Sequence, residues 1–114
     1  MRLVEVAPDL PQHTLDLLEL MAICDAPFES CGVVLKDGSV CRYENVCDEP
    51  EHGFDATLEH DLEAVDIIWH SHPNGLQWPS RQDMPTIEEV TGYGHEIRWG
   101  IITPGGHINV YVMK

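Results

Sequence analysis

The hydrophobic positions of this chain follow helix-like and strand-like periods in alternating blocks. Between Leu10 and Ile23, apolar residues recur at steps of three and four, which predicts a helix with one apolar face. Asp9 and Gln12 have the spacing of a capping box, and Pro11 suits a first helical turn because its missing N–H would be unpaired there anyway. The pattern therefore predicts a helix that begins near residue 10 and ends shortly after Ile23.

Strand-like patterns occupy much of the remaining chain. Asp37-Gly38 is a strong two-residue hairpin signal, and it separates the β-prone runs 31–35 and 39–46. The run Ile67-Ile68-Trp69 is typical of a buried strand and leads directly into His70. Further strands are expected over 2–6, near 54–58, over 97–103 and over 108–113, with a short helix over about 84–93.

This order of elements predicts one domain over residues 1–114. We expect an α+β fold of the α/β/α-like kind, with a mixed, largely antiparallel sheet flanked by helices. No repeat or linker divides the 114 residues, and a hydrophobic content of 43% suits a globular core.

Acidic residues dominate the charge of the chain. Twenty Asp and Glu against 6 Lys and Arg give a formal net charge of -14, which would repel a phosphate backbone, so no nucleic-acid partner is expected. The apolar stretches are short and the N-terminus lacks the apolar core of a signal peptide, so we expect no membrane association and a cytoplasmic location. The four cysteines form no C-x-x-C pair, which favours free thiols, although an even count leaves disulfides open.

Two histidines at the end of a predicted strand are the main candidates for chemistry. Residues two apart on a strand share a face, so His70 and His72 would present two imidazoles toward one point. The turn that follows can bring Asp83 back as a third, oxygen ligand. Three protein ligands with an open fourth position are typical of catalytic zinc. The alternative is a histidine pair satisfied in the core or at the surface, beside an unrelated helix cap.

These residues form a spaced motif, H-x-H-x7-S-x-x-D, made by His70, His72, Ser80 and Asp83, with Glu29 upstream. The motif resembles that of the JAMM/MPN metalloproteases, in the form of a compact prokaryotic or phage-type member, and the resemblance spans nearly the whole chain. It implies the JAMM/MPN (cytidine-deaminase-like) fold, one Zn²⁺ per chain and hydrolysis of a peptide or isopeptide bond.

The resemblance also implies roles for two residues that do not hold the metal. Glu29 would take a proton from the zinc-bound water and return one to the leaving amine. Ser80 would donate a hydrogen bond to the developing oxyanion. The simpler alternatives are a solvated carboxylate at a strand end for Glu29 and a helix N-cap for Ser80.

Other functions stay open beside hydrolysis of a protein or peptide substrate. A JAMM-like domain also occurs in phage tail-tip proteins, which would make this chain a tail-assembly component of the virion. A third possibility is the processing of a ubiquitin-like sulfur carrier protein, with cleavage after its Gly-Gly tail.

Other cysteine, histidine and tryptophan residues offer weaker signals. Cys31 is expected to be a small buried residue and no nucleophile, because no feature pairs it with a histidine. His95-Glu96 begins like a zincin motif, but position 99 is Trp99, so the motif fails. Trp78 could line a substrate groove or pack in the core. Two tryptophans are expected in the core and four histidines at the surface: Trp69, Trp99, His52, His60, His95 and His107.

Acidic residues are concentrated just before the two candidate histidines. No Lys or Arg lies between Arg42 and Arg81. This segment would keep the approach to the site negative and favour a substrate with a basic tail. Acidity that serves solubility alone is the competing interpretation. Nine acidic residues belong to the segment: Glu44, Asp48, Glu49, Glu51, Asp55, Glu59, Asp61, Glu63 and Asp66.

Overall fold

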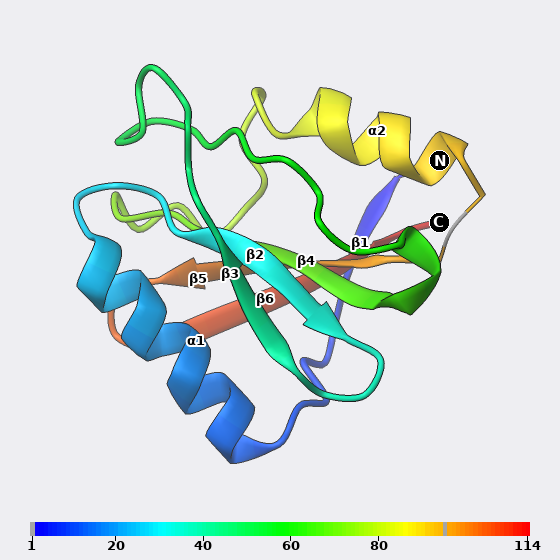
Figure 1. Cartoon of the computed structure of the whole chain (residues 1–114), viewed down its shortest axis with the longest axis horizontal. Helices are drawn as coiled ribbons and strands as arrows, with labels where there is room; N and C mark the ends of the chain where they lie inside the picture. The colour runs from blue at the N-terminus through cyan, green and yellow to red at the C-terminus, as the bar shows by residue number, and fades with distance from the viewer. Residues whose placement is uncertain (1, 95) are drawn as a thin grey trace.

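The structure is a computed structural model that describes residues 2–94 and 96–114, and within them a six-stranded sheet carries the two α-helices (Figure 1). His95, expected at the surface, lies outside the described residues. The helices and strands are β1 (Leu3–Val6), α1 (Gln12–Asp25), β2 (Cys31–Leu35), β3 (Val40–Tyr43), the 3₁₀ turn η1 (Leu62–Ala64), β4 (Val65–Ser71), α2 (Met84–Gly92), β5 (Arg98–Thr103) and β6 (His107–Met113).

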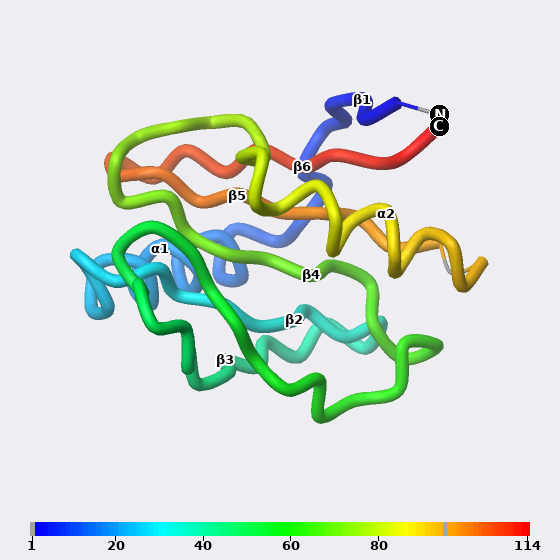
Figure 2. Tube along the Cα trace, turned by 90° about the horizontal axis from the view of Figure 1, so that it is seen from above, coloured from blue at the N-terminus to red at the C-terminus, as the bar shows by residue number. Residues whose placement is uncertain are grey.

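The sheet is mixed and mostly antiparallel, as the sequence predicts. Its strand order is β1-β6-β5-β4-β2-β3. Of the neighbouring pairs, β4 and β5 run parallel, and the other four pairs of the described sheet are antiparallel. The connection between those two strands contains α2, as a parallel pair requires a crossover. At the edge of the sheet formed by β1, the two ends of the chain lie together (Figure 2), because Arg2 and Lys114 exchange backbone hydrogen bonds of 2.6 and 2.8 Å.

The helices cover opposite faces of the sheet, which gives two apolar cores (Figure 1). On the α1 face, Leu18 packs with Ile67 and Trp69, whereas on the α2 face Ile87 packs with Trp99. Side chains alternate between these faces along each strand. The layered α+β prediction is therefore confirmed, and so is the burial of Trp69 and Trp99.

The start of α1 differs from the prediction. The N-cap residue is Pro11, and no side chain caps the helix. Asp9 has a positive φ of 48° and Gln12 donates instead to Asp16 Oδ1, one turn along the helix, at 2.9 Å. The expected capping box of Asp9 and Gln12 is wrong because the chain turns sharply at Asp9 before the helix begins.

The acidic segment after β3 also departs from its expected local structure. β3 ends at Tyr43, three residues before the expected end, and residues 54–58 form no strand. Side-chain hydrogen bonds order this segment instead. His60 is half-buried and its Nδ1 lies 2.6 Å from the Tyr43 hydroxyl, so the expectation of a surface histidine without a partner is wrong there.

All four cysteines are free thiols, which agrees with the expectation, and Cys31 is buried at the start of β2. Among the described residues, no helix combines the length and the apolar character that crossing a membrane requires.

Candidate metal centre

Strand β4 delivers the two histidines to one point at its C-terminal end. His70 lies within β4, and the His72 amide extends the ladder by donating to the carbonyl oxygen of Ile102 at 2.9 Å. Because the backbone stays extended through both residues, their rings lie on the same face of the sheet. The Nε2 atoms of His70 and His72 are 2.9 Å apart, and both side chains are buried.

Asp83 completes a group of three donor atoms. It occupies the N-cap position of α2, but its carboxylate does not cap the helix. Asp83 Oδ2 instead lies 3.0 Å from His70 Nε2 and 3.2 Å from His72 Nε2. The backbone amide of Ser80 donates to the same oxygen at 2.7 Å. The Ser80–Asp83 turn thus points a buried carboxylate at the two imidazoles.

The donor set and its spacing fit a tetrahedral metal ion. Zinc takes imidazole nitrogens and carboxylate oxygens at about 2.0–2.2 Å, which places neighbouring ligand atoms about 3.3 Å apart. The three observed separations of 2.9, 3.0 and 3.2 Å are close to that value. Two ring nitrogens that lie 2.9 Å apart and face the same carboxylate oxygen are donor atoms that one shared cation could hold together.

Neighbouring groups fix both imidazoles. His72 Nδ1 lies 2.7 Å from the carbonyl oxygen of Leu76, which requires a proton on Nδ1, so in the neutral imidazole the Nε2 lone pair is free for a metal. The ring of Phe54 stacks on His70 with a centroid separation of 4.6 Å. The position of Phe54 was missed from the sequence, because residues 54–58 were expected to form a strand.

Glu29 lies beside the histidines, directly before β2. One carboxylate oxygen of Glu29 and one ring nitrogen of each histidine are within 4.8 Å of one another, so these three residues also form a group that could hold a metal. Glu29 is only 5% exposed, and among the described residues its Oε1 has no hydrogen-bond partner. A buried, unpartnered carboxylate oxygen is costly unless another group completes the site.

The protonation of these groups follows from burial and from their contacts. Burial raises the pKa of Glu29 to about 7, against an opposing effect of His72. Burial also lowers the pKa of His70. For His72 the Asp83 and Leu76 hydrogen bonds outweigh burial and raise its pKa. Burial of Asp83 is outweighed by hydrogen bonds from both histidines, so the pKa of Asp83 lies below its usual value.

Ser80 and Trp78 lie on the segment between His72 and α2. Ser80 is half-buried, and its Oγ accepts a hydrogen bond from the Asp83 amide at 3.3 Å, so its own proton is available to another acceptor. Asp83, and not Ser80, occupies the helix N-cap position. Trp78 is 58% exposed and its ring packs at 5.4 Å from that of Tyr111, so it is not a core residue.

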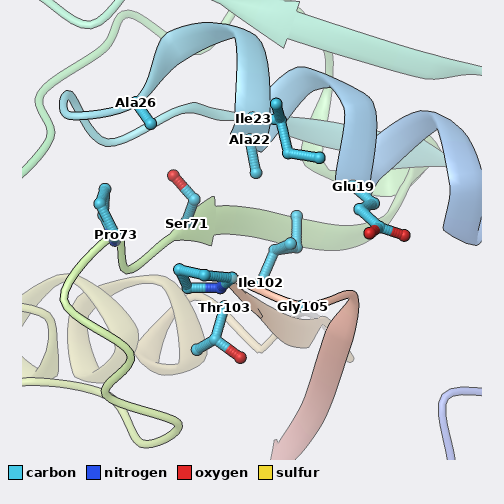
Figure 3. Close-up of a pocket in the computed structure, with 10 residues that line it drawn as sticks. Glu19, Ala22, Ile23, Ala26, Ser71, Pro73, Ile102, Thr103 and Gly105 are labelled. Atoms are coloured by element: carbon cyan, nitrogen blue, oxygen red, sulfur yellow. The ribbon is translucent and has the colours of Figure 1, made fainter.

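Two hollows of the described structure bear on the candidate site. One, of about 590 Å³, is lined by acidic residues of the 44–66 segment and by Gln82, the neighbour of Asp83. The other, of about 170 Å³, lies on the α1 face of the sheet and is mainly apolar. Figure 3 shows its lining, with Ser71 at the end of β4 and Ala22 and Ile23 on α1.

Comparison with known proteins gives one family and one relative. A family model described as prokaryotic homologs of the JAB domain matches residues 11–112. Tail tip assembly protein K of Escherichia phage N15 is 31% identical to this chain over 96 residues, which is 77% of this chain and 40% of that protein. The chain thus spans about 40% of the length of that curated relative.

Proposed function

The chain belongs to the prokaryotic homologues of the JAB domain, and from that premise we propose that it is a zinc-dependent hydrolase of peptide or isopeptide bonds. One Zn²⁺ per chain would be held by His70, His72 and Asp83, with Glu29 as the general base and Ser80 as an oxyanion donor. The observation that carries the proposal is the meeting of three buried donor atoms within 3.2 Å of one another, beside a buried carboxylate whose Oε1 has no hydrogen-bond partner among the described residues.

Zinc is the metal that this donor set favours. Two neutral imidazoles and one carboxylate suit zinc, whereas Mg²⁺ and Ca²⁺ prefer sites built from oxygen. When bound, the ion would polarise the scissile carbonyl and lower the pKa of a water molecule. Asp83 is preferred to Glu29 as the third ligand because its oxygen lies 3.0 and 3.2 Å from the two ring nitrogens.

Glu29 has the placement and the acidity that a proton carrier needs. Burial raises the pKa of this carboxylate to about 7 in the metal-free protein, which suits a group that accepts a proton from water and then gives it up. Water adds to the carbonyl carbon, the C–N bond breaks, and the proton held by Glu29 goes to the leaving nitrogen. Carboxylate and amine are formed, and Glu29 returns to its starting state.

Ser80 is suited to stabilise the oxygen of the attacked carbonyl. Its amide and its Oγ are both engaged with Asp83, which fixes the side chain, while its hydroxyl proton remains available. A single such donor contributes about 3 kcal/mol to the transition state in other hydrolases. The exposed ring of Trp78 would then border the substrate groove.

The test compares zinc-loaded wild-type protein with Glu29→Gln and Ser80→Ala on a panel of substrates. The panel contains unmodified peptides, an isopeptide-linked pair and a ubiquitin-like domain with a Gly-Gly tail joined to a reporter. We expect turnover by wild type, loss of about 10²-fold or more in Glu29→Gln with zinc retained, and a smaller loss in Ser80→Ala. Unchanged turnover in Glu29→Gln would refute the role of the glutamate.

Substrate preference decides between the branches of this proposal. Cleavage only after the Gly-Gly tail would assign the chain to processing of a ubiquitin-like sulfur carrier protein. Cleavage of unrelated peptides would assign it to broad peptidase activity.

A second function is supported by the phage relative. That protein is named for tail tip assembly, and 77% of this chain aligns with part of it. The chain would then be a component of the tail of a virion. Purified tails that contain the chain, and retain it when His70 and His72 are both replaced by alanine, would favour this role over hydrolysis.

A further inference from the structure

The backbone that carries Glu29 is joined to β4 by an unusual pair of hydrogen bonds. The Ser71 amide donates to the Ser30 carbonyl oxygen at 2.8 Å. In return, the Ser30 amide donates to the side-chain oxygen of Ser71 at 2.7 Å. Ser30 and Ser71 are 1% and 2% exposed, so water cannot replace either bond.

The hydroxyl oxygen of Ser71 accepts the hydrogen bond that the Ser71 backbone carbonyl would accept in a regular ladder. β2 and β4 are antiparallel, and Cys31 is opposite His70, so the next pair along the ladder is Ser30 with Ser71. In a hydrogen-bonded pair of an antiparallel sheet, each residue donates to the backbone carbonyl of the other. Here the side chain accepts one of the two bonds. The ladder therefore ends at this pair, and the chain before it is free to turn Glu29 toward the histidines.

Backbone contacts hold Glu29 on its other side as well. The Glu29 amide donates to the Pro50 carbonyl oxygen at 2.6 Å, and the Glu29 carbonyl accepts from Asn45 Nδ2 at 2.9 Å. By contrast, Glu29 Oε1 has no partner among the described residues. The place of this carboxylate is thus set by the backbone on either side of it.

Ser71 does not belong to the candidate metal centre itself. It lies between His70 and His72 in the sequence, and neighbouring residues of a strand point to opposite faces. The side chain of Ser71 accordingly lines the hollow on the α1 face, with Ala22 and Ile23 (Figure 3).

We propose that Ser71 is a positioning residue, whose hydroxyl ties the Glu29–Ser30 backbone to β4 and so holds the Glu29 carboxylate beside the two imidazoles. The catalytic consequence rests on the function proposed above. The same strand would then fix the metal ligands with one face and the general base with the other.

The chain offers a matched pair of variants for this test. Ser71→Thr keeps the hydroxyl, whereas Ser71→Val has the same shape without it. Both are β-branched and suit a strand. The hollow of about 170 Å³ beside Ser71 has room for the added methyl group. Any difference between the two variants therefore reports on the hydroxyl.

The first measurement is the hydrogen-exchange rate of the Ser30 amide, observed by NMR. We expect exchange at least about tenfold faster in Ser71→Val than in Ser71→Thr, because the buried amide loses its acceptor. Zinc affinity is expected to stay within about twofold of wild type in both variants, since the three candidate ligands are untouched. Equal exchange rates in the two variants, or a loss of zinc affinity in Ser71→Val alone, would overturn the proposal.

The second measurement is turnover. Misplacement of a catalytic group by about 1 Å can cost on the order of 10²-fold in rate. We therefore expect kcat to fall by about that factor in Ser71→Val with KM unchanged, and Ser71→Thr to retain most of the wild-type kcat. Faster exchange with an equal kcat in both variants would overturn the positioning role.

If zinc-loaded wild type shows no turnover, the proposed function fails separately. A crystal structure of Ser71→Val then decides the matter. A Glu29 carboxylate beyond 4.8 Å from the ring nitrogens supports positioning by Ser71, and one still within that distance overturns it.

Discussion

His72 Nδ1 lies 2.7 Å from the carbonyl oxygen of Leu76, so the other ring nitrogen of His72 faces His70 and Asp83, with its lone pair free when the imidazole is neutral. That carbonyl belongs to the fourth residue after His72, and the Asn74-Gly75 turn brings it back toward the ring. A metal ligand whose second nitrogen donates to a carbonyl is held in one tautomer and one orientation. The loop after β4 therefore fixes the His72 ring in the orientation that the proposed metal ligand requires.

Replacement of His72 should weaken zinc binding strongly. His72→Ala removes one of three proposed ligands, so the Kd for zinc should rise by more than the roughly 10-fold to 100-fold that loss of an outer partner causes. His107→Ala is the control, because His107 is exposed at the start of β6. Titration with zinc under a competing chelator measures both. Equal affinities for the two variants would contradict the assignment of His72.

The stability of the metal-free protein should depend on pH through Glu29. Burial raises the pKa of Glu29 from 4.5 to about 7, so the folded state binds this proton more tightly than the unfolded state does. The stability that the group contributes is present below pH 4.5 and is lost as the pH rises through 7. Glu29→Gln cannot ionise, and its Tm minus that of wild type should increase between about pH 5 and pH 8.

Thermal melts in the presence of a chelator provide this comparison. A difference in Tm that stays constant across the range would show that Glu29 ionises in the folded protein as it does in the unfolded chain.

Gly32 should be the least replaceable glycine of the β2–β3 hairpin. A Cβ atom at this position would collide with the Cys41 carbonyl oxygen and stand 2.8 Å from Trp69 Cζ2. Gly32→Ala must separate β2 from β3, so we expect a loss of about 3 kcal/mol or more in the free energy of unfolding. Gly92→Ala is the control, since its Cβ would meet nothing within 4 Å and alanine favours a helix by up to about 1 kcal/mol. Urea denaturation of the metal-free variants should rank them in that order, and a Gly32→Ala protein as stable as wild type would contradict the packing described.

The acidic hollow beside Gln82 predicts that binding of a basic substrate depends on salt concentration. Asp48, Glu49 and Asp55 line it. If these charges attract the substrate, KM for a lysine-rich peptide should rise several-fold between about 0.05 and 0.5 M salt. A neutral peptide of equal length should show no such rise. Equal salt dependence of the two peptides would leave the acidic segment with a role in solubility alone.

Local pattern predicted the parts of the site that lie on regular structure or close together in sequence. The period of two along β4 is enough to place His70 and His72 on one face, and the short Ser80–Asp83 turn is enough to bring a carboxylate back toward them. The hairpin signal at Asp37-Gly38 and the alternation of strand and helix patterns are also local, and they predicted the sheet with helices packed against it.

The remaining features depend on contacts that no local pattern encodes. Ser30 meets Ser71 across 41 residues, so the placement of Glu29 depends on the register of two distant strands. Asn45 orders the acidic segment through side-chain bonds to Glu29 and Gly53, without any hydrophobic period. The one signal in the sequence for the placement of Glu29 is Ser71 itself, a polar residue between the two proposed ligands on a buried strand.

The most direct test of the metal centre is an anomalous difference map at the zinc edge from a crystal of the zinc-loaded protein. The account predicts one peak per chain, about 2.0–2.2 Å from His70 Nε2, His72 Nε2 and an oxygen of Asp83, with the Glu29 carboxylate outside bonding distance. A peak that is bonded to Glu29 and not to Asp83, or the absence of any peak between the two imidazoles, would contradict it.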